Sequence, residues 1–371
     1  MKKENIKNTG NERASNIELL RIVSILLVVF SHFCVHSSFN FSTEELSMNQ
    51  ILVQIGEIGE IGVSVFVIIT GFYSVNKKNG TKKIVSILME VWFYNILILI
   101  LTLLSKEKID FGLMLKHILP IYNTHWFIYT YMFLYALIPF INRFLMNIDR
   151  ICYQKLIILL LASWGIVYTF TGADLNYSYL LWFVFLYMLG AYVKIYGNEK
   201  PNRTHNGFCL LICMSLMIGS TIVIDMFGLK YEFYPEHGNH FYSLHSPFVL
   251  GSAFSLFQIF RGFKIKQNRW INAIAGTTLA IYLISDNVFV RSWLWNDVFK
   301  NVLYSNSCYL LLVGVIEVLA VCSICAILDI VRKKVFERKI LVKLIQVICN
   351  VVEQVFSTLV STVWKWTQKL L

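Results

Sequence analysis

Long apolar segments recur along the chain and are separated by short polar loops. Each approaches the length of about 20 residues that a helix needs to cross the hydrocarbon core of a bilayer. Ten such segments run approximately over 17–36, 58–75, 83–104, 124–142, 154–171, 178–196, 208–227, 244–262, 270–290 and 306–331. The pattern predicts an all-α integral membrane protein, in which residues 1–332 form a bundle of about ten transmembrane helices.

The hydrophobic pattern changes after the tenth segment. Polar residues then recur every three or four positions, which places them on one stripe of a mostly apolar helix. Lys365 and Lys369 lie beside Trp364 and Trp366, a combination that suits the interface between lipid and water. We predict that residues 333–371 form a cytoplasmic amphipathic interfacial helix, with a coiled-coil or helix-docking surface as the alternative.

The composition supports a membrane protein. Of the 371 residues, 57% are hydrophobic and only 15% are charged, whereas about 25% are charged in a typical soluble domain. The net charge is +11, but the Lys and Arg residues lie in short loops, without a basic domain that could bind nucleic acid. The charge of the loops alternates, and the positive-inside rule then predicts a multi-pass cell-membrane protein with both termini in the cytoplasm.

The first apolar segment carries ionisable side chains where a membrane span usually has none. Arg21 and His32 are eleven residues apart, or three turns plus about 20°, so they share one helix face about 16 Å apart. An arginine at the centre of a membrane helix costs about 2.5 to 3.5 kcal/mol, so such residues usually face a protein interior or a wet cavity. Both are therefore candidate catalytic residues. In the alternative interpretation, Arg21 extends to the interface beside Glu18 and His32 is a neutral packing residue.

The loop after the second segment is a candidate anion site. It contains four lysines, Lys77, Lys78, Lys82 and Lys83, near the predicted cytoplasmic end of the first helix. Together with Arg21 they could bind the phosphates of a nucleotide, although short basic loops also arise from topology alone.

Further ionisable residues lie within or beside the apolar segments. Glu90 is about two turns into the third segment and needs a partner there, for which a structural ion pair is the simplest explanation. Asp329 in the tenth segment has an arginine three residues later. His125 and Trp126 open the fourth segment, where interfacial aromatic residues are expected in any case. Asp286 lies near the outer end of the ninth segment, from which it could reach an outer cavity.

A metal site is another chemistry that the first segment permits. His36 follows His32 by four residues, so both imidazoles could face one metal ion. The sequence places no third ligand convincingly, and we predict no metal. Eight cysteines are scattered mostly through apolar segments, and Cys322 and Cys325 are predicted to be packing residues.

Several short motifs occur in order along the ten predicted segments. They are Arg21 and His32 in the first, the Thr70-Gly71-Phe72 turn that closes the second, His125-Trp126-Phe127 with Pro139 in the fourth, Ser246-Pro247 in the eighth, and Gly276 to Asn287 in the ninth. Single motifs are weak signals, but their order on a ten-span plan resembles the membrane acyltransferase family 3. The resemblance extends through about Arg332.

The resemblance implies an activity and a role for several residues. Members of that family move acyl groups, usually acetyl from cytoplasmic acetyl-CoA, onto cell-surface glycans or other small acceptors. By this resemblance His32 corresponds to the essential histidine of the family and Arg21 to the arginine that accompanies it. The basic group of the family corresponds to the four lysines of the loop, which lack the bidentate grip of arginine.

Two positions depart from the motifs of the family. Thr70 stands where relatives commonly have serine, and Ser285 stands where many have histidine. If that histidine contributes to acceptor chemistry in relatives, this protein uses Asp286 or another substrate instead. The predicted substrate-binding residues are Glu90, His125, Trp126, Ser285 and Asp286.

The sequence therefore predicts an integral-membrane O-acyltransferase, and specifically an O-acetyltransferase for a bacterial surface polysaccharide or its lipid-linked precursor. Acetyl-CoA or another acyl-CoA is the expected donor substrate, with no permanently bound cofactor. The expected partners are the lipid bilayer, the acyl-CoA and the glycan or lipid-linked sugar acceptor, with a separate extracytoplasmic transferase where the acyl group is handed on. The alternatives are a secondary transporter or glycan flippase that uses the same charged track, and a catalytically silent sensor or assembly subunit.

Overall fold

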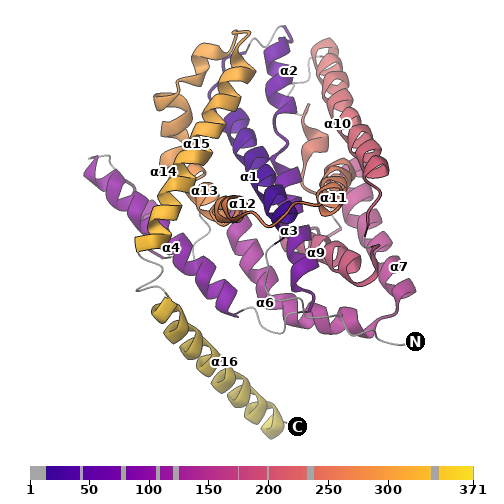
Figure 1. The fold of residues 1–371 in the computed structure, drawn as a ribbon, viewed down its shortest axis with the longest axis vertical. Coiled ribbons are helices and arrows are strands. Elements are labelled where there is room, and N and C mark those ends of the chain that lie inside the picture. The colour runs from indigo at the N-terminus through magenta and orange to yellow at the C-terminus, as the bar shows by residue number, and fades with distance from the viewer. Residues whose placement is uncertain are drawn as a thin grey trace.

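The computed structural model describes residues 14–41, 45–76, 81–105, 109–119, 125–173, 175–198, 200–231, 238–335 and 342–370. All regular structure in these ranges is helical, and the helices form a bundle with one helix, α16, extending away from it (Figure 1). The first half contains α1 (Ser15–His36), α2 (Met48–Ile55), α3 (Gly59–Ser74), α4 (Thr81–Leu104), α5 (Phe111–Ile118), α6 (Trp126–Asn147), α7 (Arg150–Leu160), the π-helix η1 (Leu161–Val167), α8 (Tyr168–Thr171) and α9 (Tyr179–Tyr196). The second half contains α10 (Arg203–Tyr231), η3 (His240–Tyr242), α11 (Pro247–Arg261), α12 (Arg269–Ala275), α13 (Thr278–Ser285), α14 (Val288–Ser292), η4 (Trp293–Val298), η5 (Asn301–Tyr304), α15 (Leu310–Arg332) and α16 (Val342–Leu370).

The predicted fold class is confirmed. Within the described residues, nine helices are long and apolar enough to cross a membrane, or ten if one bent pair is counted as a span. The chain is thus an all-α integral membrane protein with several spans. The set of helices nevertheless differs from the ten predicted segments in two places.

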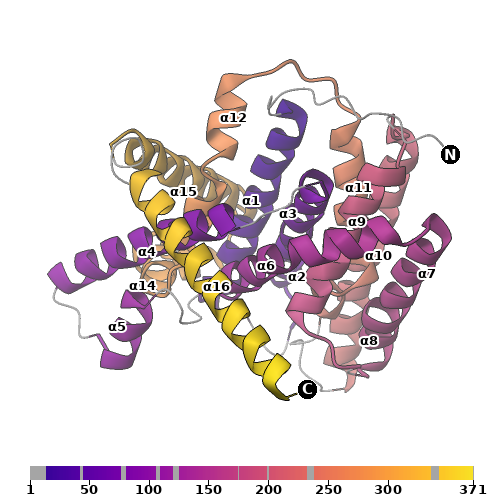
Figure 2. The ribbon, with the colours of Figure 1, turned by 90° about the horizontal axis from the view of Figure 1, so that it is seen from below.

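The differences concern α11 and α16. Helix α11 occupies the predicted segment 244–262 but has only fifteen residues, which gives a length of about 22 Å, less than the about 30 Å of a hydrocarbon core. Residues 345–362 of α16 are long and apolar enough to cross a membrane. Figure 2 shows α16 passing α4, which it contacts. The interfacial location of α16 stays a prediction.

The predicted ninth segment is broken. Helices α12 and α13 are followed after Ser285 by α14 and η4, and the two parts are bent by 74°. The break has a local cause, because the side chain of Asn287 accepts a hydrogen bond from the backbone N–H of Phe289 and so begins a new helix. Asp286 is the last residue before this new start.

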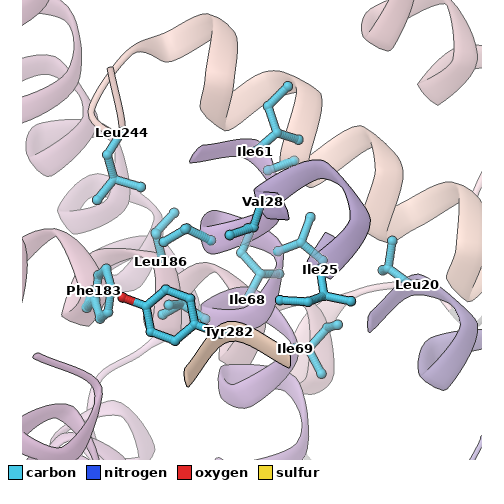
Figure 3. Close-up of a cluster of buried hydrophobic side chains, with 14 of the residues drawn as sticks. Leu20, Ile25, Val28, Ile61, Ile68, Ile69, Phe183, Leu186, Leu244 and Tyr282 are labelled. Atoms are coloured by element: carbon cyan, nitrogen blue, oxygen red, sulfur yellow. The ribbon is translucent and has the colours of Figure 1, made fainter. Parts of the chain in front are cut away.

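Helix α3 lies at the centre of the packing. It contacts α1, α9 and α11, and its buried isoleucines meet side chains of α1 and α9 (Figure 3). A side chain at Gly71 would overlap the backbone carbonyl of Tyr187 in α9, so glycine is needed there for close approach of the two helices. The predicted turn at Gly71 is wrong, because α3 continues as a helix to Ser74.

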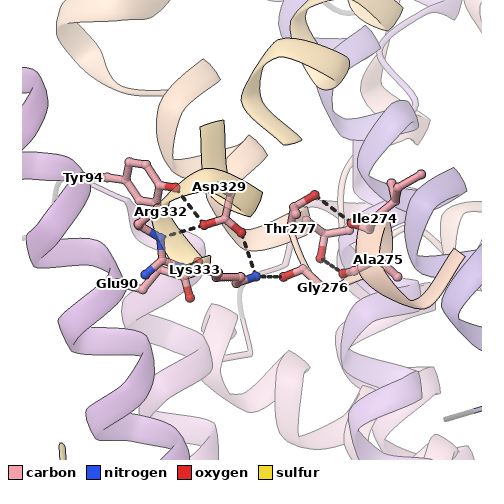
Figure 4. Close-up of polar contacts among 10 residues, drawn as sticks. Glu90, Tyr94, Ile274, Ala275, Gly276, Thr277, Asp329, Arg332 and Lys333 are labelled. Atoms are coloured by element: carbon pink, nitrogen blue, oxygen red, sulfur yellow. Dashed lines mark hydrogen bonds and ion pairs between the residues drawn. The ribbon is translucent and has the colours of Figure 1, made fainter. Parts of the chain in front are cut away.

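A buried ionic network ties α15 to α4 and to the α12–α13 junction (Figure 4). Asp329 is fully buried and accepts hydrogen bonds from the Tyr94 hydroxyl at 2.8 Å and from Arg332 Nε at 2.7 Å. Arg332 Nη2 also pairs with Glu90 Oε1 at 3.1 Å. Lys333 Nζ lies 2.7 Å from Asp329 Oδ2 and donates to the carbonyl of Gly276 at 2.5 Å. The structural ion pair predicted for Glu90 is therefore present, with Arg332 as its partner.

Candidate functional site

Two cavities lie one after the other along α1. The larger, which we call the wide cavity, has a volume of about 600 Å³ and is lined by α1, α3, α4, α6, α12 and α13. The smaller, which we call the small cavity, has a volume of about 170 Å³ and is lined by α1, α3, α6 and α13. Arg21 lines the wide cavity and His32 lines the small one, so the two intramembrane polar groups of α1 face protein cavities.

Four side chains line both cavities and so lie between them. They are Val28, Val63, Phe127 and Tyr282, which we call the partition. Tyr282 is nearly fully buried, and its ring lies 5.8 Å from that of Phe127 and 6.1 Å from that of His32, between ring centroids. Figure 3 shows Tyr282 and Val28 among the buried apolar side chains of α3 and α9. Three of the four partition side chains are hydrocarbon, the fourth, Tyr282, carries a hydroxyl, and the Tyr282 ring is close to His32.

The wide cavity carries more cations than carboxylates. Its ionisable residues are Glu18, Arg21, Lys82, Lys83 and Glu90. Arg21 Nε lies 3.8 Å from Glu18 Oε1, and Glu90 is already paired with Arg332. Positive charge at Lys82 and Lys83 therefore adds to that of Arg21 at the same cavity, which suits an anionic group. Lys77 and Lys78 lie outside the described residues.

His32 and Asp286 are brought together from distant parts of the sequence. His32 Nε2 lies 3.9 Å from Asp286 Oδ1, and His36 Nε2 lies 3.4 Å from the same oxygen. Arg291 Nη1 is 3.5 Å from it as well. The break after Ser285 places Asp286 beside the C-terminal half of α1.

The two nitrogens of His32 have different surroundings. Nε2 faces the Asp286 carboxylate, whereas Nδ1 is buried and has no hydrogen-bond partner within the described part of the chain. A carboxylate next to one ring nitrogen favours the neutral tautomer that has its proton on that nitrogen. The other ring nitrogen can then accept a proton. The 3.9 Å distance exceeds a hydrogen bond, but such contacts often tighten only when substrate is bound. In this arrangement His32 could act as a base if the contact with Asp286 shortens.

The same groups could also hold a metal ion. The ligand atoms of His32, His36 and Asp286 all lie within 4.8 Å of one another, so the structure supplies the third ligand that the sequence did not place. The guanidinium of Arg291 also contacts Asp286 Oδ1, and its positive charge would repel a metal ion bound to that oxygen. We therefore interpret the group as an ion-pair network around Asp286.

The other predicted substrate-binding residues are distributed around the two cavities. Trp126 lines the small cavity with His32, and Glu90 lines the wide one. His125 is 2% exposed and lines neither, although its ring lies 5.5 Å from that of Tyr282. Ser285 is fully buried in α13 and lines neither cavity. Of these residues, only Asp286 is within ion-pair distance of His32.

Several lining residues were missed by the sequence analysis, among them Tyr282 and Glu60. Tyr282 is one apolar position among many in its segment, and nothing local marks it as part of a partition between cavities. Glu60 lies at the start of the second segment, where a carboxylate is easily taken for an interfacial residue, but it lines the small cavity. A carboxylate inside an apolar stretch was the available signal for Glu60.

Most of the chain is similar to a known protein family. A family model described as "Acyltransferase domain", Acyl_transf_3, matches residues 15–327. This range includes α1, both cavities and Asp286. No curated protein and no solved structure matches the chain.

Proposed function

We propose, on the premise that this chain belongs to the membrane acyltransferase family 3, that it is an O-acetyltransferase. Membership of the family makes it a membrane acyltransferase, and the donor and acceptor are our proposal. The donor is acetyl-CoA, and the acceptor is a hydroxyl of a bacterial surface polysaccharide or of its lipid-linked precursor. The observation that carries the proposal is the pair of cavities along α1, with a cation in one and an imidazole in the other.

The donor binds in the wide cavity. Arg21, Lys82 and Lys83 line it and provide the positive charge that the phosphates of a coenzyme A require. Lys77 and Lys78 are proposed to extend this anion site. The distance along α1 from Arg21 to His32 is about 16 Å, comparable to the length of a pantetheine arm, so a thioester could reach the partition.

The acceptor hydroxyl is activated in the small cavity. His32 removes the hydroxyl proton while the acceptor oxygen forms a bond to the thioester carbonyl carbon. The carbon–sulfur bond then breaks, and the departing thiolate takes the proton from His32 and leaves as coenzyme A. Asp286 holds the imidazole and stabilises its positive charge during the step. A two-step route, in which His32 first carries the acetyl group, uses the same residues.

The direction of the reaction follows from the charge of the loops. The positive-inside rule places the lysine loop after α3, and with it the wide cavity, on the cytoplasmic side of the cell membrane. Acetyl-CoA is made inside the cell, so the donor would enter from the side where it occurs. The small cavity then faces the side on which surface glycans are assembled.

Labelled acetyl-CoA tests this function directly. Purified protein in lipid nanodiscs receives acetyl-CoA carrying a radioactive acetyl group together with a glycan acceptor. The expected result is label covalently attached to the acceptor and free coenzyme A in equal amount. Accumulation of substrate in sealed vesicles without covalent change would instead support a transporter and would reject the proposal.

Arg21→Ala should weaken use of the donor. Loss of a charged hydrogen-bonding group costs about 1.5–3 kcal/mol, so the KM for acetyl-CoA is expected to rise by about tenfold or more. Arg143→Ala is the matched control, because Arg143 is an exposed cation that lines neither cavity. Initial rates against acetyl-CoA concentration measure both variants. A wild-type KM for Arg21→Ala would remove Arg21 from the donor site.

A further inference from the structure

Glu60 and His32 line the same small cavity, at a place where α1 and α3 are closely packed. A Cβ atom added at Gly59 of α3 would lie only 2.7 Å from the Cβ atom of Ser31 in α1, so a side chain has no room there. Ser31 is the residue before His32, and Glu60 is the residue after Gly59. The backbones that carry His32 and Glu60 are therefore close, and both residues line the small cavity.

The carboxylate of Glu60 has an unused acceptor. Its Oε2 atom is buried and has no hydrogen-bond partner within the described ranges. Glu57, only three residues earlier, accepts a hydrogen bond from Asn239 Nδ2 at 2.5 Å. Buried carboxylate oxygens are normally hydrogen-bonded, so an unpartnered one on a residue that lines a cavity points to a missing hydrogen-bond donor, which a ligand could supply.

The remaining walls of the small cavity are largely aromatic. Trp126, Phe127 and Tyr282 line it together with Glu60 and His32. Its volume of about 170 Å³ is slightly larger than the about 150 Å³ of an engineered apolar cavity that binds benzene, so the cavity has room for about one ring and not for a longer glycan. A pyranose ring carries C–H groups on its faces and hydroxyl hydrogens at its edge, which suits aromatic walls beside an acceptor oxygen.

We propose that Glu60 is the acceptor-binding residue of the small cavity and that this subsite takes a sugar ring bearing hydroxyl or ammonium hydrogens, not an anionic sugar. This inference rests on the proposed acetyl transfer. Glu60 accepts hydrogen bonds from the ring and so holds the hydroxyl to be acetylated at His32. A carboxylate or phosphate on the ring would instead be repelled by the carboxylate of Glu60.

Binding is measured apart from catalysis, on full-length His32→Ala protein in nanodiscs. The probes are methyl glucoside, methyl glucosaminide and methyl glucuronide, which are neutral, cationic and anionic, and saturation-transfer NMR detects weak binding of each. We expect the first two to bind and the glucuronide to bind at least about tenfold more weakly. Preferential binding of the glucuronide would overturn the proposal, and this comparison requires no change at Glu60.

Variants at Glu60 provide the second measurement. In the same background, Glu60→Gln keeps the shape and is expected to weaken binding of the glucosaminide by about tenfold, because charge-assisted hydrogen bonds are about twice as strong as neutral ones. Glu60→Ala should weaken both bound glycosides. Glu57→Gln is the matched control and should change neither, since Glu57 does not line the small cavity. Unchanged binding in both Glu60 variants would overturn the proposal.

The two proposals fail in different ways. If His32-containing protein transfers no label to any acceptor but the glycosides bind as expected, the acetyl transfer is wrong and the sugar subsite stands. If label is transferred while the Glu60 variants bind all glycosides like the parent, the transfer stands and the role of Glu60 is wrong.

Discussion

Replacing His32 with alanine should reduce acetyl transfer by about 10²- to 10⁴-fold, which is the contribution of a positioned general base. The physical reason is that His32 is the imidazole of the small cavity and has one nitrogen toward Asp286 and one without a partner among the described residues. The measurement is surface-glycan O-acetylation by mass spectrometry or NMR in cells that express each variant, supported by rates with labelled acetyl-CoA in nanodiscs.

His36→Ala is the matched control for this prediction. His36 lies one turn further along α1 and also contacts Asp286, but it lines neither cavity. We expect at most about a tenfold loss, because the base itself remains in place. Membrane insertion and abundance are compared first by immunoblotting of membrane fractions. Unchanged acetylation in His32→Ala cells with normal protein abundance would remove the catalytic role of His32.

Replacing Arg332 with alanine should destabilise the fold by about 3–5 kcal/mol, the usual cost of breaking a buried ion pair from one side. Arg332 is 5% exposed and neutralises two acidic groups, Asp329 and Glu90. Its removal would leave the fully buried Asp329 with Lys333 as its nearest cation and would remove the ion pair between α15 and α4 (Figure 4). Thermal unfolding of the purified protein in detergent measures the effect.

Two further variants test whether the loss of stability comes from the broken ion pair or from the loss of any positive charge. Lys334→Ala removes the exposed neighbouring cation and should change stability by no more than about 0.5 kcal/mol. A triple variant, Glu90→Gln with Asp329→Asn and Arg332→Met, removes all three charges and should recover part of the lost stability. An unfolding temperature of Arg332→Ala equal to that of the wild type would contradict the assigned role.

The parts of the site on α1 could be predicted from the sequence. Arg21 and His32 stand out because ionisable groups are rare in apolar spans, and the regular geometry of a helix fixes their common face. The structure places them at two consecutive cavities. The fold class followed from the length and spacing of the apolar segments, which the membrane constrains strongly.

The parts contributed by other helices were harder to predict. Asp286 was recognised as a residue near the outer end of a segment, but its approach to His32 depends on the 74° break, whose local signal is the capping residue Asn287. Gly71 was interpreted as a turn because glycine permits many backbone conformations, whereas here it allows contact with Tyr187. Contacts between distant segments, such as Tyr282 with His32, depend on packing and have no local signature.

The partition also has a consequence for electrical insulation. A cell membrane maintains a voltage, and each 100 mV is worth about 2.3 kcal/mol for every elementary charge that crosses. A continuous column of water past Arg21 and His32 would let protons discharge this voltage. Hydrophobic side chains disfavour water in a narrow passage, and Val28, Val63 and the rings of Phe127 and Tyr282 lie between the cavities. Under the proposed acetyl transfer, these side chains would therefore have to limit water and proton flow between the two cavities while the acyl group passes.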